Sequence, residues 1–232
     1  MSYKTINASV WNGKMNSLAT KLGLGKTQVL SFDLLAGSTC PKASLCHAWV
    51  TEDKDGNREL HKGKHMAFLC YAAKIESCGP RASVYRRHKS NTMALYACNG
   101  DIDKMAQKLQ SVIRKTTRVI RIHSSGDFFS PFYFAAWCKV ASDNPNIVFF
   151  AYTKILSLVL SNHPDNLHLV YSYGGQDDAT RDKLAEQGHH VPTCYVTTPS
   201  TTMPGIPVAC KSDKNDDYGY ILAGQSFQIY KH

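Results

Sequence analysis

The sequence has no apolar run long enough to cross a membrane, and no glycine-rich dinucleotide-binding turn follows a predicted strand. Residues 1–26 are polar and lack the charged and apolar regions of a secretory signal, so we expect a cytoplasmic protein without membrane contact. Acidic residues are scarce, because 18 Asp and Glu stand against 27 Lys and Arg, for a formal net charge of +9. Such a charge suggests polyanionic partners, nucleic acid first among them.

Cysteine, in contrast, is plentiful, with eight residues. Thiols in a reducing cytoplasm stay free or bind metal rather than form disulfides. Cys40, Cys46 and Cys70 lie in one polar, irregular stretch, and Pro41 prevents regular structure, so Cys40 must lie on a loop. Free cysteines are often small buried hydrophobes, which is the alternative interpretation. Several thiolates presented together are nevertheless ligands for zinc and iron–sulfur clusters, and we predict a cysteine-bound metal centre.

An iron–sulfur cluster takes four protein ligands when closed, or three when one iron is left open. The first three candidates are those of the central stretch. Cys78 and Cys210 compete for a fourth position, followed by Cys194, which lies in a predicted strand where a core role is equally open. Cys138 is expected in the core, and Cys98 stays undecided. A [4Fe–4S] cluster, a larger cluster and more than one cluster all stay open.

Zinc is the rival metal. Cys40 and Cys46, followed by His61 and His65, resemble a Cys2His2 pattern. The first gap is wider than usual in that pattern, and both histidines lie in the lysine-rich segment HKGKH. Surface histidines are the simpler interpretation of this pair.

The order of predicted elements favours one α/β domain. Strands are expected over residues 27–35, 118–123, 147–152, 167–171 and 191–197, and helices over residues 64–75, 82–97, 101–115, 130–143, 156–161 and 177–187. Strands that alternate with helices through short connections predict parallel strands covered by helices. We expect a partial or complete (β/α) barrel of the TIM type, with an open doubly wound sheet as the alternative. Residues 1–26 form a polar N-terminal segment, 47–64 a surface excursion, and 199–232 a tail that packs on the barrel.

In either arrangement, the carboxyl ends of the strands are the place for chemistry. His123, Ser125 and Asp127 follow a predicted strand directly, and Gly126 permits a sharp turn there. These side chains are candidates for acid–base or substrate-orienting roles. The alternative is a loop that caps the next helix. Tyr152 and Lys154 are secondary candidates, while the residues that could contact phosphates are Arg81, Arg86, Arg87, Lys89, Arg114, Lys115 and Arg118.

Several groups of residues together resemble the phage "gene product 88"-type domain family. They are T-C-P-x-A-x-x-C from Thr39, C-Y-A from Cys70, R-I-H-x-S-G-D-F-F-S from Arg121, F-A-Y-T-K from Phe150, and D-D-Y…A-G…F-x-I-x-x-H near the end. The cysteine loop of this family after a first strand is similar to the iron–sulfur site of radical-SAM barrels. The resemblance therefore implies a barrel-like fold and an iron–sulfur cluster. The C-x3-C-x2-C spacing is absent, so SAM chemistry is not carried over.

Two functional hypotheses follow. The first is a phage-encoded iron–sulfur protein in the host cytoplasm, acting as a redox or cluster-dependent enzyme on an unidentified small molecule, with its cluster at the carboxyl ends of the strands. The second is a nucleic-acid-binding protein whose iron–sulfur or zinc site is structural.

Overall fold

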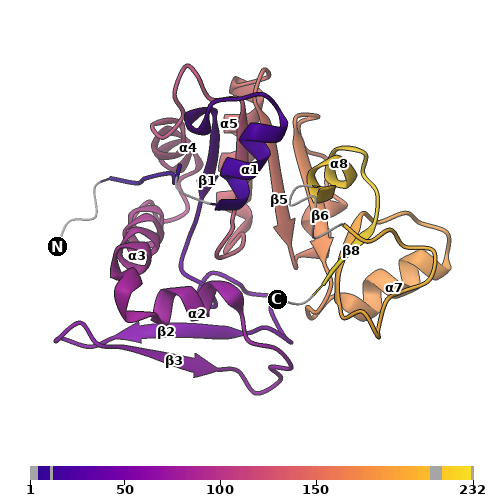
Figure 1. The fold of residues 1–232 in the computed structure, drawn as a ribbon. Helices are drawn as coiled ribbons and strands as arrows, with labels where there is room; N and C mark the ends of the chain where they lie inside the picture. Colours follow the sequence, from indigo (N-terminus) through magenta and orange to yellow (C-terminus); the bar gives the residue numbers. More distant parts are fainter. Residues whose placement is uncertain (1–4, 11–12, 210–215, 231–232) are drawn as a thin grey trace.

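The structure, a computed structural model, describes residues 5–10, 13–209 and 216–230. A six-stranded parallel sheet forms its centre, with strand order β1-β4-β5-β6-β7-β8. Its strands are β1 (Val29–Phe32), β4 (Val119–Ile122), β5 (Val148–Thr153), β6 (Leu167–Ser172), β7 (Thr193–Thr197) and β8 (Phe227–Tyr230). A separate antiparallel hairpin, β2 (Ala48–Glu52) and β3 (Arg58–Lys62), lies on the side of the molecule toward which β5 and β6 point (Figure 1).

Helices connect most of the strands, as the alternating pattern predicted. They are α1 (Gly13–Lys21), α2 (Tyr71–Ser77), α3 (Ala82–Tyr96), α4 (Ile102–Gln110), α5 (Pro131–Asp143), α6 (Leu156–Val159), α7 (Asp178–Glu186) and α8 (Asp216–Leu222), with short 3-10 turns at Lys26–Gln28 and Gly79–Arg81. The prediction of a single mixed α/β domain with parallel strands is confirmed. Within the described part of the chain, no helix combines the length and apolarity needed to cross a bilayer.

The larger core lies between the sheet and α3, α4 and α5. Ser130 starts α5 by accepting a hydrogen bond from the Tyr133 N–H at 3.2 Å, and Pro131 occupies the first turn. Trp137 of α5 then packs edge-on against Phe32 of β1, with ring centroids 5.5 Å apart. Aromatic side chains of this size bury more apolar area than any others, so they fix α5 on this face of the sheet.

Helices α1 and α8 cover the opposite face of the sheet (Figure 1). Met15 and Leu18 of α1 and Ile221 of α8 pack with Val29 and Phe227. This arrangement corrects two sequence predictions. The segment expected to be polar over residues 1–26 contains a helix with a buried side. The tail over residues 199–232 supplies α8 and the sixth strand of the sheet rather than only packing on it.

Short backbone bridges cover both edges of the sheet. Ser9 forms an antiparallel bridge with Ser31 of β1, with N–H···O distances of 2.7 and 2.9 Å. At the other edge, Val208 forms a parallel bridge with Gln228 of β8. Each bridge pairs only one residue of its edge strand, and β1 does not pair with β8 among the described residues. These residues therefore do not form the complete TIM-type barrel, and the sheet is open.

The excursion expected over residues 47–64 is confirmed as a hairpin, but the following helix starts later than predicted. Leu45 O accepts hydrogen bonds from the Ala67 and Phe68 N–H groups at 2.8 and 3.1 Å. These bonds hold the chain in a loop up to Cys70, which stands directly before α2 instead of within a helix. The hairpin packs on α2 through a small core that includes Ala48.

Gly37 provides a test of how closely the loop after β1 packs against the hairpin. It adopts a φ of +72°, and a Cβ on it would lie 2.3 Å from Ala48 O. Gly56 has a φ of +84° but open space around it, so Gly56→Ala is the matched control. The left-handed backbone costs each variant about 1–2 kcal/mol. Overpacking should add about 1–3 kcal/mol to Gly37→Ala alone, measured by urea unfolding. Equal losses in the two variants would contradict this packing.

Candidate functional site

Cys40 lies in a backbone-closed turn of the loop that follows β1. The Cys40 N–H donates to Gly37 O at 3.0 Å, and the Thr39 hydroxyl donates to Leu35 O at 2.7 Å. Gly126, in the loop after β4, has a φ of +87°, and a Cβ there would lie 2.6 Å from Thr39 Oγ1. The sharp turn expected at Gly126 is therefore present, and it lets the two loops pack together.

Cys46 stands at the other end of the same loop, beside the segment that follows β6. Ala43 forms a backbone bridge with Gly175, and the Leu45 N–H donates to Gly174 O at 3.1 Å. The cysteine loop thus crosses the carboxyl end of β6. Leu45 O also accepts hydrogen bonds from the segment before Cys70. The cysteine loop, the segment after β6 and the segment before Cys70 therefore meet at Leu45.

The backbone hydrogen bonds of Leu45 O bring the loop of Cys40 and Cys46 next to the segment that ends at Cys70. Burial raises the pKa of Cys40 well above its usual value, and the negative charge of Asp127 raises it further. Cys70 and Cys46 act on the Cys40 pKa in the same direction. Burial also raises the pKa of Cys70, with Cys46 adding to the shift. If all three sulfur atoms were thiolates, their negative charges would repel one another. A bound cation would then be needed to offset this repulsion.

Asp127 is buried at the edge of this group. Its Oδ2 accepts the Lys154 N–H at 2.9 Å, and its Oδ1 accepts the Phe128 N–H at 2.7 Å. Burial raises the pKa of Asp127, and these hydrogen bonds oppose the rise. The alternative interpretation is thus confirmed in part: Ser130 of this loop caps α5, and Asp127 accepts backbone N–H groups, although these join the ends of β4 and β5.

Lys154 brings a buried positive charge to the same place. Its Nζ donates to the carbonyl oxygens of Ser172 and Tyr173 at 2.9 and 3.0 Å. Burial raises the pKa of Cys46, whereas the charge of Lys154 lowers it. Lys154 therefore favours the thiolate form at Cys46. Tyr152, the other candidate from this strand, instead donates to Asp217 Oδ2 at 2.6 Å on the α1 and α8 face.

His123 points away from the thiols, into the aromatic core beside α5. Its Nε2 lies 2.9 Å from the Tyr133 hydroxyl, and its ring packs against Phe128. Its buried Nδ1 has no hydrogen-bond partner in the described structure. Burial, with a smaller effect of Arg121, lowers the pKa of His123 to about 3. Ser125, the third candidate, donates its hydroxyl to Glu76 Oε1 at 2.9 Å. The three predicted residues therefore do not form one acid–base group.

The other cysteines lie apart from this group. Cys78 directly follows the last residue of α2, so it is separated from Cys70 at the other end of the helix by about 12 Å along the axis. Cys194 is in the core under α1 and α8, where burial raises its pKa to about 12. Cys138 packs against the larger core and Cys98 is buried in it. Cys210 lies outside the described residues.

The histidines of the zinc alternative lie on or near the hairpin. His61 Nε2 is 2.7 Å from Thr51 Oγ1, and its ring stacks on Trp49. His65 is exposed. Among the residues that the structure describes, no three His, Cys, Asp or Glu side chains are arranged to hold a single metal ion. In this part of the chain, neither the zinc alternative nor the group of Cys40, Cys46 and Cys70 therefore has a preassembled site for a single metal ion.

Two pockets flank the cysteine loop. The larger, of about 600 Å³, lies between α7 and the ends of β6 and β7, and its walls include Leu45, Tyr173 and Tyr195. The smaller, of about 480 Å³, opens at Cys40 and is also lined by His47. Aromatic and apolar walls with a few polar groups are typical of small-molecule sites. The loop that carries two of the thiols thus forms part of the wall of both pockets.

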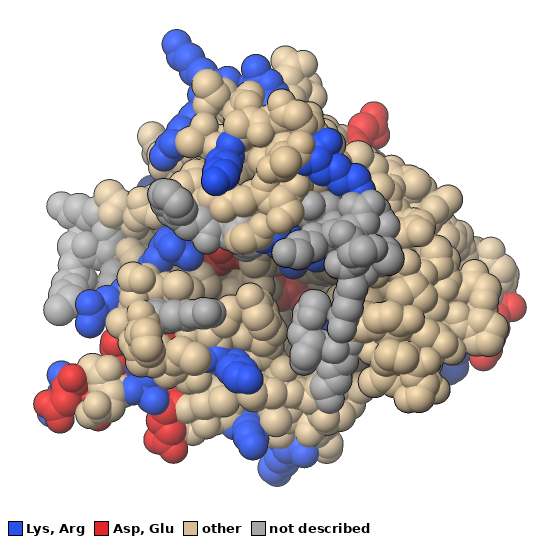
Figure 2. All heavy atoms as spheres, in the orientation of Figure 1, with Lys and Arg blue, Asp and Glu red and all other residues tan. Residues whose placement is uncertain are grey.

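The described basic residues among those singled out in the sequence lie on two separate parts of the chain. Arg86 is exposed on α3, while Arg114, Lys115 and Arg118 are exposed in the connection from α4 to β4. Figure 2 shows the basic side chains of one face spread over several elements, with acidic ones among them. Nucleic-acid binding stays a prediction from the net charge.

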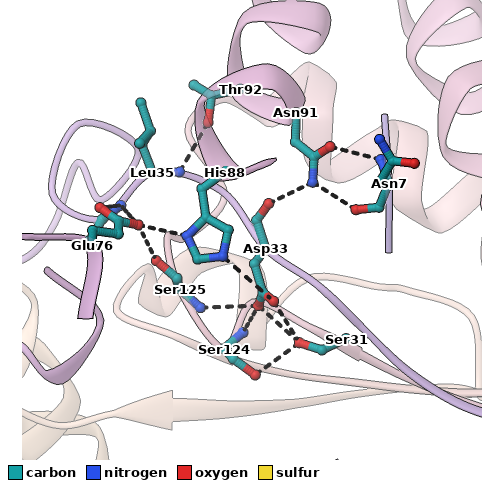
Figure 3. A network of polar contacts seen from close by, with 11 residues as sticks. Asn7, Ser31, Asp33, Leu35, Glu76, His88, Asn91, Thr92, Ser124 and Ser125 are labelled. Carbon is teal, nitrogen blue, oxygen red and sulfur yellow. Dashed lines mark hydrogen bonds and ion pairs between the residues drawn. The ribbon is translucent and has the colours of Figure 1, made fainter. Parts of the chain in front are cut away.

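Asp33, Glu76 and His88 are buried residues whose importance the sequence did not indicate. Figure 3 shows their side chains pointing toward one another, from the end of β1, from α2 and from α3. Asp33 had one available signal, since a charge inside an apolar strand requires partners. His88 stands among the basic residues Arg86, Arg87 and Lys89, and nothing in the sequence near Glu76 indicates its role.

Comparisons with known proteins give a consistent result. A family model described as "Gene product 88" matches residues 7–222. The Gene 88 protein of Mycobacterium phage L5 is 29% identical over 159 residues, which cover 65% of this chain and 66% of that protein. The Gene 88 protein of Mycobacterium phage D29 is 27% identical over 166 residues, or 68% and 69% of the two chains. No solved structure matches the chain.

The His123 environment predicts a specific dependence of stability on pH. The pKa of His123 is about 3 in the folded protein against an ordinary value of 6.5, so between these values the unfolded chain binds one more proton. The free energy of unfolding of the wild type should therefore fall by about 1.4 kcal/mol for each pH unit below pH 6.5. Well above pH 6.5, this group should have no effect on it.

The variant His123→Asn removes the titrating ring and keeps a residue that tolerates the φ of +66°. Urea unfolding of both proteins at several pH values between 7.5 and 4.5 provides the measurement. The wild type should lose stability faster than the variant as the pH falls. A wild-type-minus-variant difference that stays constant with pH would show that His123 is not held neutral.

Proposed function

This chain belongs to the Gene product 88 family of bacteriophage proteins, and we propose that it is an iron–sulfur protein. Cys40, Cys46 and Cys70 would hold the cluster at the carboxyl ends of the parallel strands. The observation that carries this proposal is the backbone contact between the two thiol-bearing segments: Leu45 O, next to Cys46, accepts the Ala67 and Phe68 N–H groups of the segment before Cys70 at 2.8 and 3.1 Å. If these cysteines were only small hydrophobic residues of the core, nothing would require them to lie together in an irregular, polar part of the chain.

The donor set suits such a cluster. Thiolates are its usual protein ligands, and three of them leave one iron open to a further ligand. Because the ligands of one cluster bind different irons, their sulfur atoms need not approach as closely as those around a single ion. Cys78 lies too far along α2 to be an evident fourth ligand, and three-cysteine ligation is therefore the simplest arrangement.

The neighbouring charges give the three thiols different properties. Lys154 favours the thiolate at Cys46, and Asp127 opposes it at Cys40. Cys40, Cys46 and Cys70 are half-buried, and because the pKa of each is raised, the three thiols hold their protons at neutral pH when no metal is bound. Binding must therefore release protons, so cluster uptake should become weaker as the pH falls.

The position of the cysteine loop in the walls of both pockets favours a redox or cluster-dependent enzyme over a purely structural site. When bound, the cluster would supply single-electron chemistry or hold a substrate atom at its open iron. Leu45 lines the larger pocket and directly precedes Cys46, so a small molecule in that pocket would lie next to the site. The aromatic walls formed by Tyr173 and Tyr195 would orient it and exclude water.

Single substitutions of the ligands test the proposal. Cys40→Ser, Cys46→Ser and Cys70→Ser should each lower iron affinity by roughly tenfold or more, since even residues that only support a metal ligand contribute that much. Iron and acid-labile sulfide per chain are measured after anaerobic purification and reconstitution.

Cys138→Ser is the matched control, because this thiol is half-buried on α5 and packs against the larger core. It should keep the iron and sulfide content of the wild type. Iron loss in the control that equals the loss in Cys40→Ser would overturn the assignment of ligands. Full iron content in all three ligand variants would overturn it as well.

A further inference from the structure

A buried polar network links the segments that carry the proposed ligands (Figure 3). Glu76 is 0% exposed, and both His88 and Asp33 are 4% exposed. Carboxylates are almost never buried to this extent without several partners. The hydrogen-bond partners of Glu76 and Asp33 therefore identify the segments that this network fixes in place.

Glu76 makes three separate contacts. Its two carboxylate oxygens accept the Ala36 N–H at 3.1 and 3.3 Å. Its Oε1 also accepts the Ser125 hydroxyl at 2.9 Å and lies 2.7 Å from His88 Nδ1. One carboxylate thus joins α2, the loop after β1, the loop after β4 and α3.

Asp33 completes the network from the end of β1. Its Oδ1 accepts the backbone N–H groups of Ser124 and Ser125 at 2.6 and 3.2 Å. Its Oδ2 lies 3.9 Å from His88 Nε2, so the imidazole stands between two carboxylates. These contacts hold the loop after β4 against the start of the cysteine loop.

The contacts of Glu76 lie close in the sequence to two of the proposed ligands, Cys40 and Cys70. Cys70 stands directly before α2, on which Glu76 lies. Ala36 is four residues before Cys40, and the turn between them is closed by backbone hydrogen bonds. The bond from the Ala36 N–H to Glu76 therefore ties the segment of Cys40 to the helix that Cys70 precedes.

We propose that Glu76 is a positioning residue that sets the placement of Cys40 relative to Cys70. Thr92 of α3 supports it, because its Oγ1 accepts the N–H of Leu35, the residue before Ala36, at 3.0 Å. Glu76 is fully buried and lines neither pocket, so it acts through the thiol-bearing segments and not on a substrate. For cluster binding the inference rests on the proposed function, whereas for the arrangement of the thiols it stands alone.

The test compares wild type, Glu76→Gln and the control Glu52→Gln. Glu52 lies at the end of β2 that is farther from Cys46 in the sequence, and its carboxylate pairs with Lys89 Nζ at 3.1 Å. Metal-free protein is treated with dibromobimane, which becomes fluorescent when it bridges two thiols, and peptide mapping measures the yield of the Cys40–Cys70 product. Iron affinity is measured in parallel after reconstitution. Circular dichroism at the same temperature verifies that each variant is folded.

Glu76→Gln should lose most of the Cys40–Cys70 product and bind iron roughly tenfold or more weakly, as is typical when a residue that orients a metal ligand is changed. Glu52→Gln should match the wild type in both measurements. An unchanged yield of the Cys40–Cys70 product in folded Glu76→Gln would overturn the inference, whatever the iron result.

The thiol measurement separates this inference from the proposed function. If the wild type bound no cluster, loss of the bridged product in Glu76→Gln would still support the positioning role. If Glu76→Gln failed to fold, Thr92→Val would decide, because it releases Leu35 without changing a buried charge. A lower product yield in Thr92→Val would then support the inference, and a wild-type yield would overturn it.

Discussion

The buried carboxylate of Glu76 is the interaction on which the geometry of the cysteine site depends. It accepts hydrogen bonds from a backbone N–H and a hydroxyl, and it lies within hydrogen-bond distance of an imidazole nitrogen. Loss of the carboxylate would leave these groups unpaired in the interior, at about 1–3 kcal/mol each. A domain of this kind has about 5–15 kcal/mol of net stability, so this network is a major structural constraint. Apolar packing often stabilises an interior as well as buried charges do, so stability alone does not require a charged network here. Its location between the thiol-bearing segments therefore supports a positioning role.

The open parallel sheet explains why the cysteine segments can converge. Parallel strands bring their carboxyl ends to one edge, and the loops after β1, β4, β5 and β6 all meet there. Leu45 links this edge to the segment before Cys70 through its carbonyl oxygen. The charges of Asp127 and Lys154 reach the same place from the ends of β4 and β5. Helices α3, α4 and α5 cover one face of the sheet and α1 and α8 cover the other, whereas both pockets are lined by residues of the cysteine loop.

Much of this architecture follows from local sequence patterns. The strand expected over residues 167–171 is observed as Leu167–Ser172, because an apolar run between polar turns defines it. The helix after Ser130 begins where Ser-Pro predicts, since both residues favour a helix start. The loop position of Cys40 follows from Pro41, and the family resemblance is confirmed by the family match.

The remaining features depend on contacts between distant parts of the chain. The strand β8 has four residues, and it is a strand because β7 and Val208 pair with it on either side. Cys70 is kept out of a helix by the carbonyl of Leu45, which no pattern near Cys70 reveals. The network of Asp33, Glu76 and His88 likewise joins residues whose neighbours in sequence give no sign of the contact. Local patterns therefore place the thiols on loops but cannot show what positions them.

We propose that the convergent thiols bind an iron–sulfur cluster. An absorbance spectrum of the wild-type protein purified anaerobically from iron-replete cells, together with iron, sulfide and zinc analysis, tests this directly. We expect a brown protein with sulfide-to-iron charge-transfer absorbance and similar amounts of iron and acid-labile sulfide. A colourless protein that carries stoichiometric zinc and no sulfide would contradict it.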